Sequence, residues 1–225
     1  MNILALDTST ETCSVALWTH EVLYTECVLA PKAHAQLILP QVKRLLSEAN
    51  IALTQLNLIT FGQGPGSFTG LRIAASITQG LSYAHNIPVL PISSLRALAQ
   101  GAFRKQGYSK VYAVMDARMQ EVYWGGFELR DGIMMCMREE QLNTPESIEV
   151  PEEKGWHMAG AWGQCDFAIL TKRLGCVLEK ESSDLVPEAQ DLVPLARYEY
   201  GLGHVFSYEQ AVPRYLRNTI VKDNT

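Results

Sequence analysis

Short apolar runs and amphipathic stretches alternate along the first half of the chain. An apolar run at residues 2–6 predicts a strand, and alternating apolar side chains at Cys13, Val15 and Leu17 predict a second. A third strand is expected near residues 22–28. The three strands are close enough in sequence to be linked as hairpins.

Apolar residues at helical spacing follow, and predict a helix over residues 33–49 that Pro40 should kink or break. The remaining elements expected in the first half are a strand at 58–61, a glycine loop at 62–67, a helix at 69–84, a strand at 87–90 and a helix that Ser93 or Ser94 caps and that reaches Phe103. Helical crossovers place successive strands in parallel, so the pattern predicts an α/β fold.

The pattern starts again after Gln106. Residues 111–116 form an apolar run that ends in Asp116, just as Asp7 ends the first apolar run of the chain. Self-similarity at long period indicates a duplicated unit. The domains expected are therefore an N-terminal unit at 1–106 and a smaller related unit at 107–225.

The second half is less regular. It predicts a turn at Asp131 and Gly132, a strand near 156–158 and an apolar helix near 191–200.

Formal charge is nearly absent from one long stretch. Between Glu48 and Arg96 only Arg72 carries a charge. The expected helix at 69–84 is apolar or small on two faces, so it should be covered on both sides, either within its own domain or by a second subunit. The first face holds Leu71, Ala75 and Thr78, and the second holds Ile73, Ile77 and Ala84.

Composition narrows the class of protein. The chain has 225 residues, is 47% hydrophobic and has a formal net charge of −5, so it can form a core and should bind nucleic acid poorly by itself. Its five cysteines are odd in number and widely spaced, which is typical of reduced thiols in a cytoplasmic protein. No membrane span and no signal peptide are expected.

Few residues have the spacing of a catalytic or metal site. The five histidines form no H-x-x-x-H pair and no cysteine lies at ligand spacing from one, so no metal is expected. Ser67 lacks the G-x-S-x-G pattern of a nucleophile elbow, and no lysine follows Gly70 as a Walker loop requires. The loop at Gly64, Gly66 and Ser67 offers either an anion seat at a helix N-terminus or a tight turn, and both remain open.

The turn at Asp7, Thr8, Ser9 and Thr10 places one carboxylate and three hydroxyls after a strand. Such a hairpin holds phosphates in the actin and sugar-kinase superfamily, although these residues are also good turn formers. The corresponding turn at 116–119 carries Arg and Met, whose long side chains would crowd a polyphosphate.

Four segments together resemble one family. These are residues 1–18, the nine-residue run at 64–72 (GPGSFTGLR), the run at 115–123 with Asp116, Ala117 and Arg118, and PRYLR at 213–217. In this order they are similar to TsaB, also called YeaZ, over nearly the whole chain. Ala74 is a small departure, since the family often has Gly there.

The resemblance implies an actin-like fold (sugar kinase/Hsp70/actin superfamily) of two related subdomains, the second shortened. It also implies a role in forming threonylcarbamoyladenosine next to the anticodon of tRNA. The implied partners are the catalytic paralogue TsaD and the ATPase TsaE, with a homodimer when the chain is alone and tRNA contacted only indirectly. The two metal-binding histidines of TsaD fall on Ser94 and Leu98, so this chain resembles a non-catalytic sister without a cofactor of its own.

Contact with ATP or ADP is then expected only in the complex, at Asp7, Thr8, Ser9, Gly64, Gly66 and Ser67. An enzyme is the alternative, either a small-molecule kinase of the same superfamily or a peptidase. The absent metal ligands count against the peptidase and the crowded second turn against the kinase.

The last expectation concerns the surface that binds a partner. Two apolar helices beside the first sheet should form one association patch, as a bundle about a two-fold axis or with the paralogue. Ala75→Glu or Leu45→Glu should then give a folded monomer. The residues expected in the patch are Leu37, Ile38, Val42, Leu45, Leu46, Leu71, Ala75 and Thr78.

Overall fold

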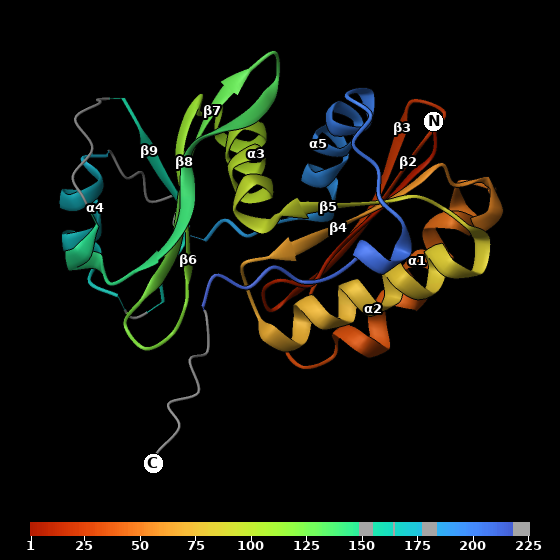
Figure 1. Ribbon diagram of the computed structural model, residues 1–225, viewed down its shortest axis with the longest axis horizontal. Helices are drawn as coiled ribbons and strands as arrows, with labels where there is room; N and C mark the ends of the chain where they lie inside the picture. The colour runs from red at the N-terminus through yellow and green to blue at the C-terminus, as the bar shows by residue number, and fades with distance from the viewer. Residues whose placement is uncertain (149–154, 164, 177–183, 218–225) are drawn as a thin grey trace.

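Two mixed β-sheets form the two lobes of the molecule, a computed structural model that describes residues 1–148, 155–163, 165–176 and 184–217 (Figure 1). The strand order is β3-β2-β1-β4-β5 in the first sheet and β8-β7-β6-β9 in the second. The strands are β1 (Ile3–Asp7), β2 (Thr12–Thr19), β3 (Val22–Leu29), β4 (Leu58–Gly64), β5 (Val89–Ser93), β6 (Lys110–Asp116), β7 (Val122–Arg130), β8 (Ile133–Asn143) and β9 (His157–Ala161).

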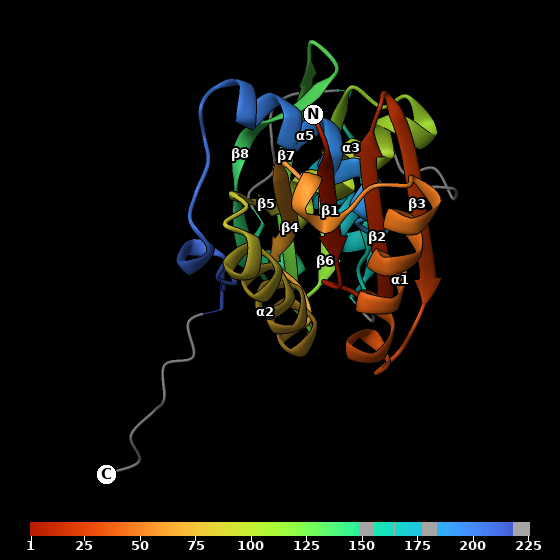
Figure 2. The ribbon, with the colours of Figure 1, turned by 90° about the vertical axis from the view of Figure 1, so that its right-hand side faces the viewer.

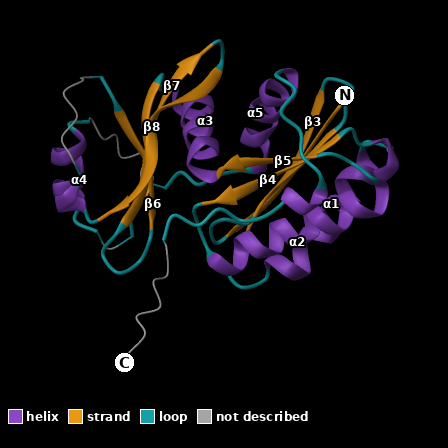
Figure 3. Ribbon diagram, viewed as in Figure 1, coloured by secondary structure: helices purple, strands orange, loops and turns teal. Residues whose placement is uncertain are grey.

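Helices cover both faces of the first sheet (Figure 3). Helices α1 and α2 bury one core against it, and α5 buries a second core against its other face. Helix α3 lies between the lobes and packs on the second sheet, while α4 lies on the far side of that sheet. The helices are α1 (His34–Glu48), α2 (Phe68–His85), α3 (Ser94–Gln106), α4 (Phe167–Leu174) and α5 (Ala189–Gly201).

The second sheet repeats the topology of the first. Strand β1 pairs with β2 in antiparallel and with β4 in parallel orientation, and β6 pairs in the same way with β7 and β9. The duplication expected from the two Asp-terminated runs is therefore confirmed. The fold is the expected actin-like α/β arrangement of two related units, of which the described part of the second has four strands and the first has five.

Two details differ from the sequence prediction. Strand β5 begins at Val89 rather than Ile87, because Asn86 adopts a left-handed conformation that ends α2 and the Ile87 N–H donates back to the Ser82 carbonyl. Helix α1 continues through Pro40 without a break. Proline removes the donor to the Gln36 carbonyl, but both residues are exposed, so water can reach that oxygen.

Most other expected elements are confirmed. Ser93 is the residue that caps α3, since its hydroxyl accepts a hydrogen bond from the Arg96 N–H. The late apolar helix is α5, and the strand expected near 156–158 is β9. Helix α4 was not expected from the sequence.

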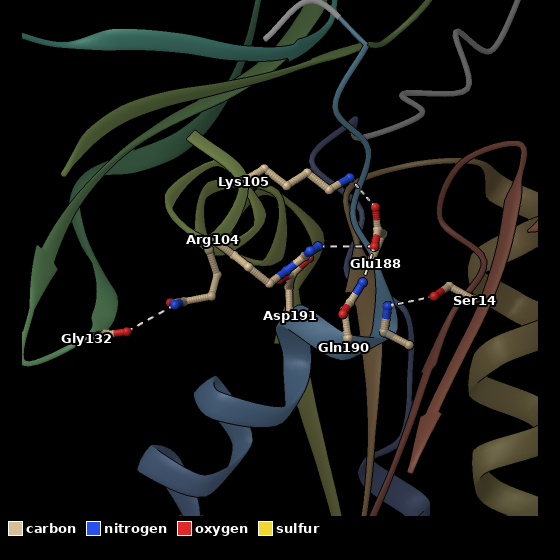
Figure 4. A network of polar contacts seen from close by, with 9 residues as sticks. Ser14, Arg104, Lys105, Gly132, Glu188, Gln190 and Asp191 are labelled. Carbon is tan, nitrogen blue, oxygen red and sulfur yellow. Dashed lines mark hydrogen bonds and ion pairs between the residues drawn. The ribbon is translucent and has the colours of Figure 1, made fainter. Parts of the chain in front are cut away.

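A polar network joins α3, α5 and β2 (Figure 4). The Arg104 guanidinium donates to both carboxylate oxygens of Asp191, at 2.7 and 2.9 Å, and Lys105 pairs with Glu188. The Ala189 N–H donates to the Ser14 hydroxyl at 2.9 Å. Residues on both sides of the boundary expected after Gln106 share this network, and that boundary remains a prediction.

Candidate functional site

The turn after β1 is buried within the first lobe. Asp7 and Thr8 have no exposed surface, and Ser9 is 1% exposed. One carboxylate oxygen of Asp7 accepts hydrogen bonds from the Ser9 N–H and hydroxyl, at 2.9 and 2.7 Å. Burial raises the pKa of Asp7 to about 6, although both bonds from Ser9 lower it.

The glycine loop closes on this turn through backbone contacts. The Ser67 N–H donates to the Ser9 carbonyl at 2.7 Å, and the Thr8 hydroxyl donates to the Gly70 carbonyl at 2.7 Å. A Cβ atom on Gly70 would lie 1.9 Å from the Thr8 carbonyl oxygen, and one on Gly62 would lie 2.0 Å from the Asp7 carboxylate. Gly70 is needed because the Thr8 backbone leaves no room for a side chain, and Gly62 because the Asp7 carboxylate occupies that space.

Several N–H groups in and after the loop donate to other groups of the chain. The Gly64 N–H donates to the Ser94 hydroxyl at 3.2 Å, and the Gly70 N–H donates to the Ser67 hydroxyl at 3.3 Å. Together with the Ser67 N–H, two donors of the loop and one of the first turn of α2 are engaged inside the chain. These bonds describe a tight turn, and the anion seat at this helix N-terminus stays a prediction.

The residues expected to face a nucleotide differ in burial. Asp7, Thr8, Ser9 and Gly64 are buried, Gly66 is half-buried and Ser67 is exposed as the N-cap of α2. A nucleotide in contact with the four buried residues requires the glycine loop to move. Contact with ATP or ADP stays a prediction.

The second lobe carries the same arrangement, which the sequence did not reveal. Asp116 accepts a hydrogen bond from the Arg118 N–H at 2.9 Å, and a Cβ on Gly163 would lie 2.4 Å from the Asp116 carboxylate carbon. Gly62 lies in β4, which pairs with β1, and Gly163 follows β9, which pairs with β6. In each lobe a glycine therefore lies against the aspartate that ends the neighbouring strand. Arg118 and Met119 at the tip of this turn are exposed.

Ser94 and Leu98, at the positions of the TsaD histidines, have structural roles. The Ser94 hydroxyl is fully buried and accepts from Gly64, while Leu98 is fully buried in the core beneath the second sheet. Within the described ranges no group of three or more His, Cys, Asp or Glu side chains is placed to hold a metal ion.

A cleft lies between the two lobes. It contains one cavity of about 570 Å³ lined by residues that include Ser93, Glu140 and Arg214. A second cavity of about 520 Å³ is lined by Glu121, Glu140, Leu216 and Arg217 among others. Glu140 borders both cavities, and its carboxylate accepts a hydrogen bond from the Ser93 hydroxyl.

Comparison with known proteins decides the family. The family model described as "TsaD: tRNA N6-adenosine threonylcarbamoyltransferase" matches residues 28–170. The tRNA threonylcarbamoyladenosine biosynthesis protein TsaB of Escherichia coli (strain K12) is 39% identical, over 98% of this chain and 96% of that protein. The TsaB protein of Haemophilus influenzae is 36% identical over 98% of this chain. The chain belongs to the TsaB family.

Solved structures agree with this assignment. YeaZ from Pseudomonas aeruginosa has a TM-score of 0.85 and 40% identity, with 96% of this chain and 99% of that chain covered. A second Pseudomonas aeruginosa structure, described as similar to peptidase YEAZ, has a TM-score of 0.89 and 42% identity over 96% of this chain and 99% of that one. As a TsaB-family member, the chain is a biosynthesis protein of a tRNA modification pathway. None of the helices in the described part could cross a membrane.

The patch expected to bind a partner of this TsaB-family chain needs a correction in its residues. Six of the eight named side chains lie in the chain's own core, because α1 and α2 turn their apolar stripes toward the first sheet. Leu37 and Leu46 are half-buried. The buried six are Ile38, Val42, Leu45, Leu71, Ala75 and Thr78.

The two substitutions expected to report on that patch are therefore unsuitable. A carboxylate at Ala75 or Leu45 would enter the core and destabilise the fold instead of yielding a folded monomer. The sequence shows that a helical stripe is covered, and the structure shows that its own sheet covers it. The docking surface itself remains a prediction.

Asp7 gives a prediction for pH dependence. Burial raises the pKa of Asp7 from its ordinary value of 3.8 to about 6, so the folded state holds more protons than the unfolded state between these pH values. The free energy of unfolding should therefore fall as pH rises from about 4 to about 6, by roughly 2–3 kcal/mol from this group. The Asp7→Asn protein should lack this part of the pH dependence, because asparagine cannot ionise. Its amide oxygen can still accept the hydrogen bonds from Ser9.

Urea unfolding at pH 4.5 and 7.5 measures this effect as the difference between the two proteins. Asp131→Asn, at an exposed turn, is the control and should follow the unaltered chain at both pH values. Equal pH dependence in the Asp7→Asn protein and the unaltered chain would contradict the prediction.

Proposed function

We propose that this chain is a non-catalytic partner in threonylcarbamoyl transfer to the adenosine next to the anticodon of tRNA. It binds and supports the catalytic subunit TsaD, together with the ATPase TsaE, and forms a homodimer when alone. Contact with tRNA is made mainly through the catalytic partner. The family assignment supports the pathway, and two structural observations support the role.

The main observation behind this proposal is that the chain's own glycine loop packs against the turn at Asp7, Thr8 and Ser9. The Ser67 N–H donates to the Ser9 carbonyl, and a Cβ atom on Gly66 or Gly70 would collide with the carbonyl oxygen of Ser9 or Thr8. A kinase of this superfamily must place phosphates at that turn. Because the glycine loop occupies the space beside this turn, the structure supports a role in binding a partner rather than in phosphoryl transfer.

A second observation concerns the outer face of α2. Its exposed residues are small, polar or aromatic, and Arg72 is the only formal charge among them. Helix α1 lies beside α2 on the same side of the first sheet and adds the exposed Leu39 (Figure 2). An exposed helix face with so little charge is suited to docking a partner. The exposed α2 residues are Phe68, Thr69, Arg72, Ser76, Gly80, Tyr83, Ala84 and His85.

A peptidase is the second candidate, because one solved relative is described by similarity to a peptidase. A serine peptidase needs a hydroxyl activated by a base. Ser67, the serine of the glycine loop, instead accepts a hydrogen bond from the Gly70 N–H and caps α2. This role favours the partner function.

Reconstitution tests the proposal. The purified chain alone should hydrolyse no ATP and retain no transition metal after a chelator wash. Added to TsaD and TsaE with tRNA and substrates, it should be required for modification, and Asp7→Asn should support modification like the unaltered chain. One iron or zinc per chain, or an ATPase rate that Asp7→Asn abolishes, would identify an enzyme instead.

A further inference from the structure

The segment after α5 crosses from one lobe to the other. We call residues 202–217 the strap. Its start is fixed to the edge of the first sheet, where Phe206 and Val89 exchange backbone hydrogen bonds of 2.9 and 3.0 Å. Further along, the Gln79 side chain donates to the Ala211 carbonyl at 3.0 Å. The strap then runs past β4 toward the end of β6 (Figure 1).

One contact of the strap holds the first turn of α2. The Tyr215 ring lies 5.4 Å from the Phe68 ring, and the Tyr215 hydroxyl accepts from Arg72 Nε at 3.1 Å. The Arg72 guanidinium also lies 3.7 Å from the centre of the Phe68 ring. Phe68, Arg72 and Tyr215 therefore form one cluster on the surface.

The next contact holds the turn between β6 and β7. Arg217 donates to the Ala117 carbonyl at 3.0 Å and pairs with Glu121 at 2.5 Å, and it also contacts the Met119 sulfur at 3.0 Å. Two contacts on different lobes are thus made by strap residues only two positions apart. Three consecutive residues span at most about 10 Å. Loss of the contact at Tyr215 should therefore also loosen the contact at Arg217.

The strap also occupies the cleft between the lobes. The Arg214 N–H donates to the Gln63 carbonyl at 2.8 Å, and a Cβ on Gly64 would lie 2.6 Å from the Arg214 carbonyl oxygen. Arg214 lines the interlobe cavity, whereas Leu216 and Arg217 line a cavity whose other lining residues belong to the second lobe. The strap therefore borders the interlobe cavity and rests directly on the glycine loop.

We propose that the strap is a latch that couples the first turn of α2 to the turn of the second lobe. Phe68 and Arg72 contact each other and Tyr215, so the strap is a direct connection from these two residues to the second lobe. A partner that covers Phe68 and Arg72 competes with Tyr215 and thereby frees Arg217 from Ala117 and Glu121. That last step rests on the proposed function, but the coupling itself is a property of the isolated chain.

Hydrogen exchange of the isolated chain tests the latch. The reporters are the amides of Ala117, Arg118 and Glu121, each hydrogen-bonded within the second-lobe turn. Phe68→Ala should speed their exchange about tenfold, as should Arg217→Ala, because loss of either contact loosens the strap. Ser76→Ala, at an exposed position two turns along α2, is the matched control and should leave these amides unchanged.

A double variant separates coupling from general destabilisation. Phe68→Ala combined with Tyr215→Ala should exchange no faster at these amides than Tyr215→Ala alone, since both act through one contact. The amides of β1 and β2 should exchange alike in all variants. If Phe68→Ala changes exchange only near the start of α2, or if the two substitutions add, the latch is wrong. This result is independent of whether any partner binds, so it is distinguishable from failure of the proposed function.

Discussion

Leu39→Glu is expected to leave the protein folded while weakening both self-association and TsaD binding about 100-fold or more. Leu39 is 47% exposed on α1, so glutamate is tolerated in the free chain. In a docked complex the same carboxylate would be buried against an apolar contact without a partner, which costs several kcal/mol. Support for tRNA modification should be lost in parallel.

Sedimentation, together with a titration against TsaD, measures the effect of Leu39→Glu. Ser76→Glu on the facing helix α2 should behave in the same way. Leu202→Glu is the matched control, because it places the same charge on a leucine that is 56% exposed beyond α5. A folded Leu39→Glu protein that dimerises and binds TsaD as before would show that the interface does not lie on α1 and α2.

Arg104→Met should lower the free energy of unfolding by about 3 kcal/mol at pH 7.5. Asp191 is 1% exposed, and its carboxylate accepts two hydrogen bonds from Arg104. Methionine keeps much of the packing but leaves this carboxylate buried without its cation, and breaking such a pair is strongly destabilising. For a chain of this size the loss corresponds to a fall in Tm of about 6–12 °C.

The pH dependence of this loss is a further check. Burial raises the pKa of Asp191 above its usual value even though the hydrogen bond and charge of Arg104 lower it, so removing Arg104 should raise that pKa more. The deficit of Arg104→Met should therefore shrink toward pH 5, as the carboxyl group becomes protonated. Lys43→Met, at an exposed position of α1, should show neither effect. A deficit that is equal at pH 5 and 7.5 contradicts the ion-pair explanation.

Local patterns in the sequence predicted most of the elements of the first lobe. Apolar periodicity placed α2 within one residue of each end, and the Asp-terminated runs predicted the duplicated topology. These signals succeed because they depend on residues near one another in the chain. The start of β5 was misplaced, because Asn86 adopts a positive-φ conformation that ends α2 and moves the start of the next strand to Val89.

Long-range contacts could not be predicted in the same way. The stripe through Leu45 and Ala75 shows that something covers it, but not whether this is the chain's own sheet or a second subunit. The pairing of Gly163 with Asp116, and the position of Tyr215 against Phe68, join segments that are far apart in the sequence. A glycine near the end of the fourth strand of each unit, Gly62 in β4 and Gly163 after β9, was a local sign of the first pairing.

The return of α5 to the first sheet has a consequence for synthesis on the ribosome. Ile3, Ala5 and Leu58 belong to strands made early, yet the helix that covers them begins at Ala189. Until that helix emerges, one face of the nascent first sheet lacks the cover that α5 provides, although a nascent domain generally folds as a unit when its residues are available. A fragment that stops at Gln106 would keep this apolar face exposed to water, which makes it a poor candidate for soluble expression and a natural client for chaperones during translation.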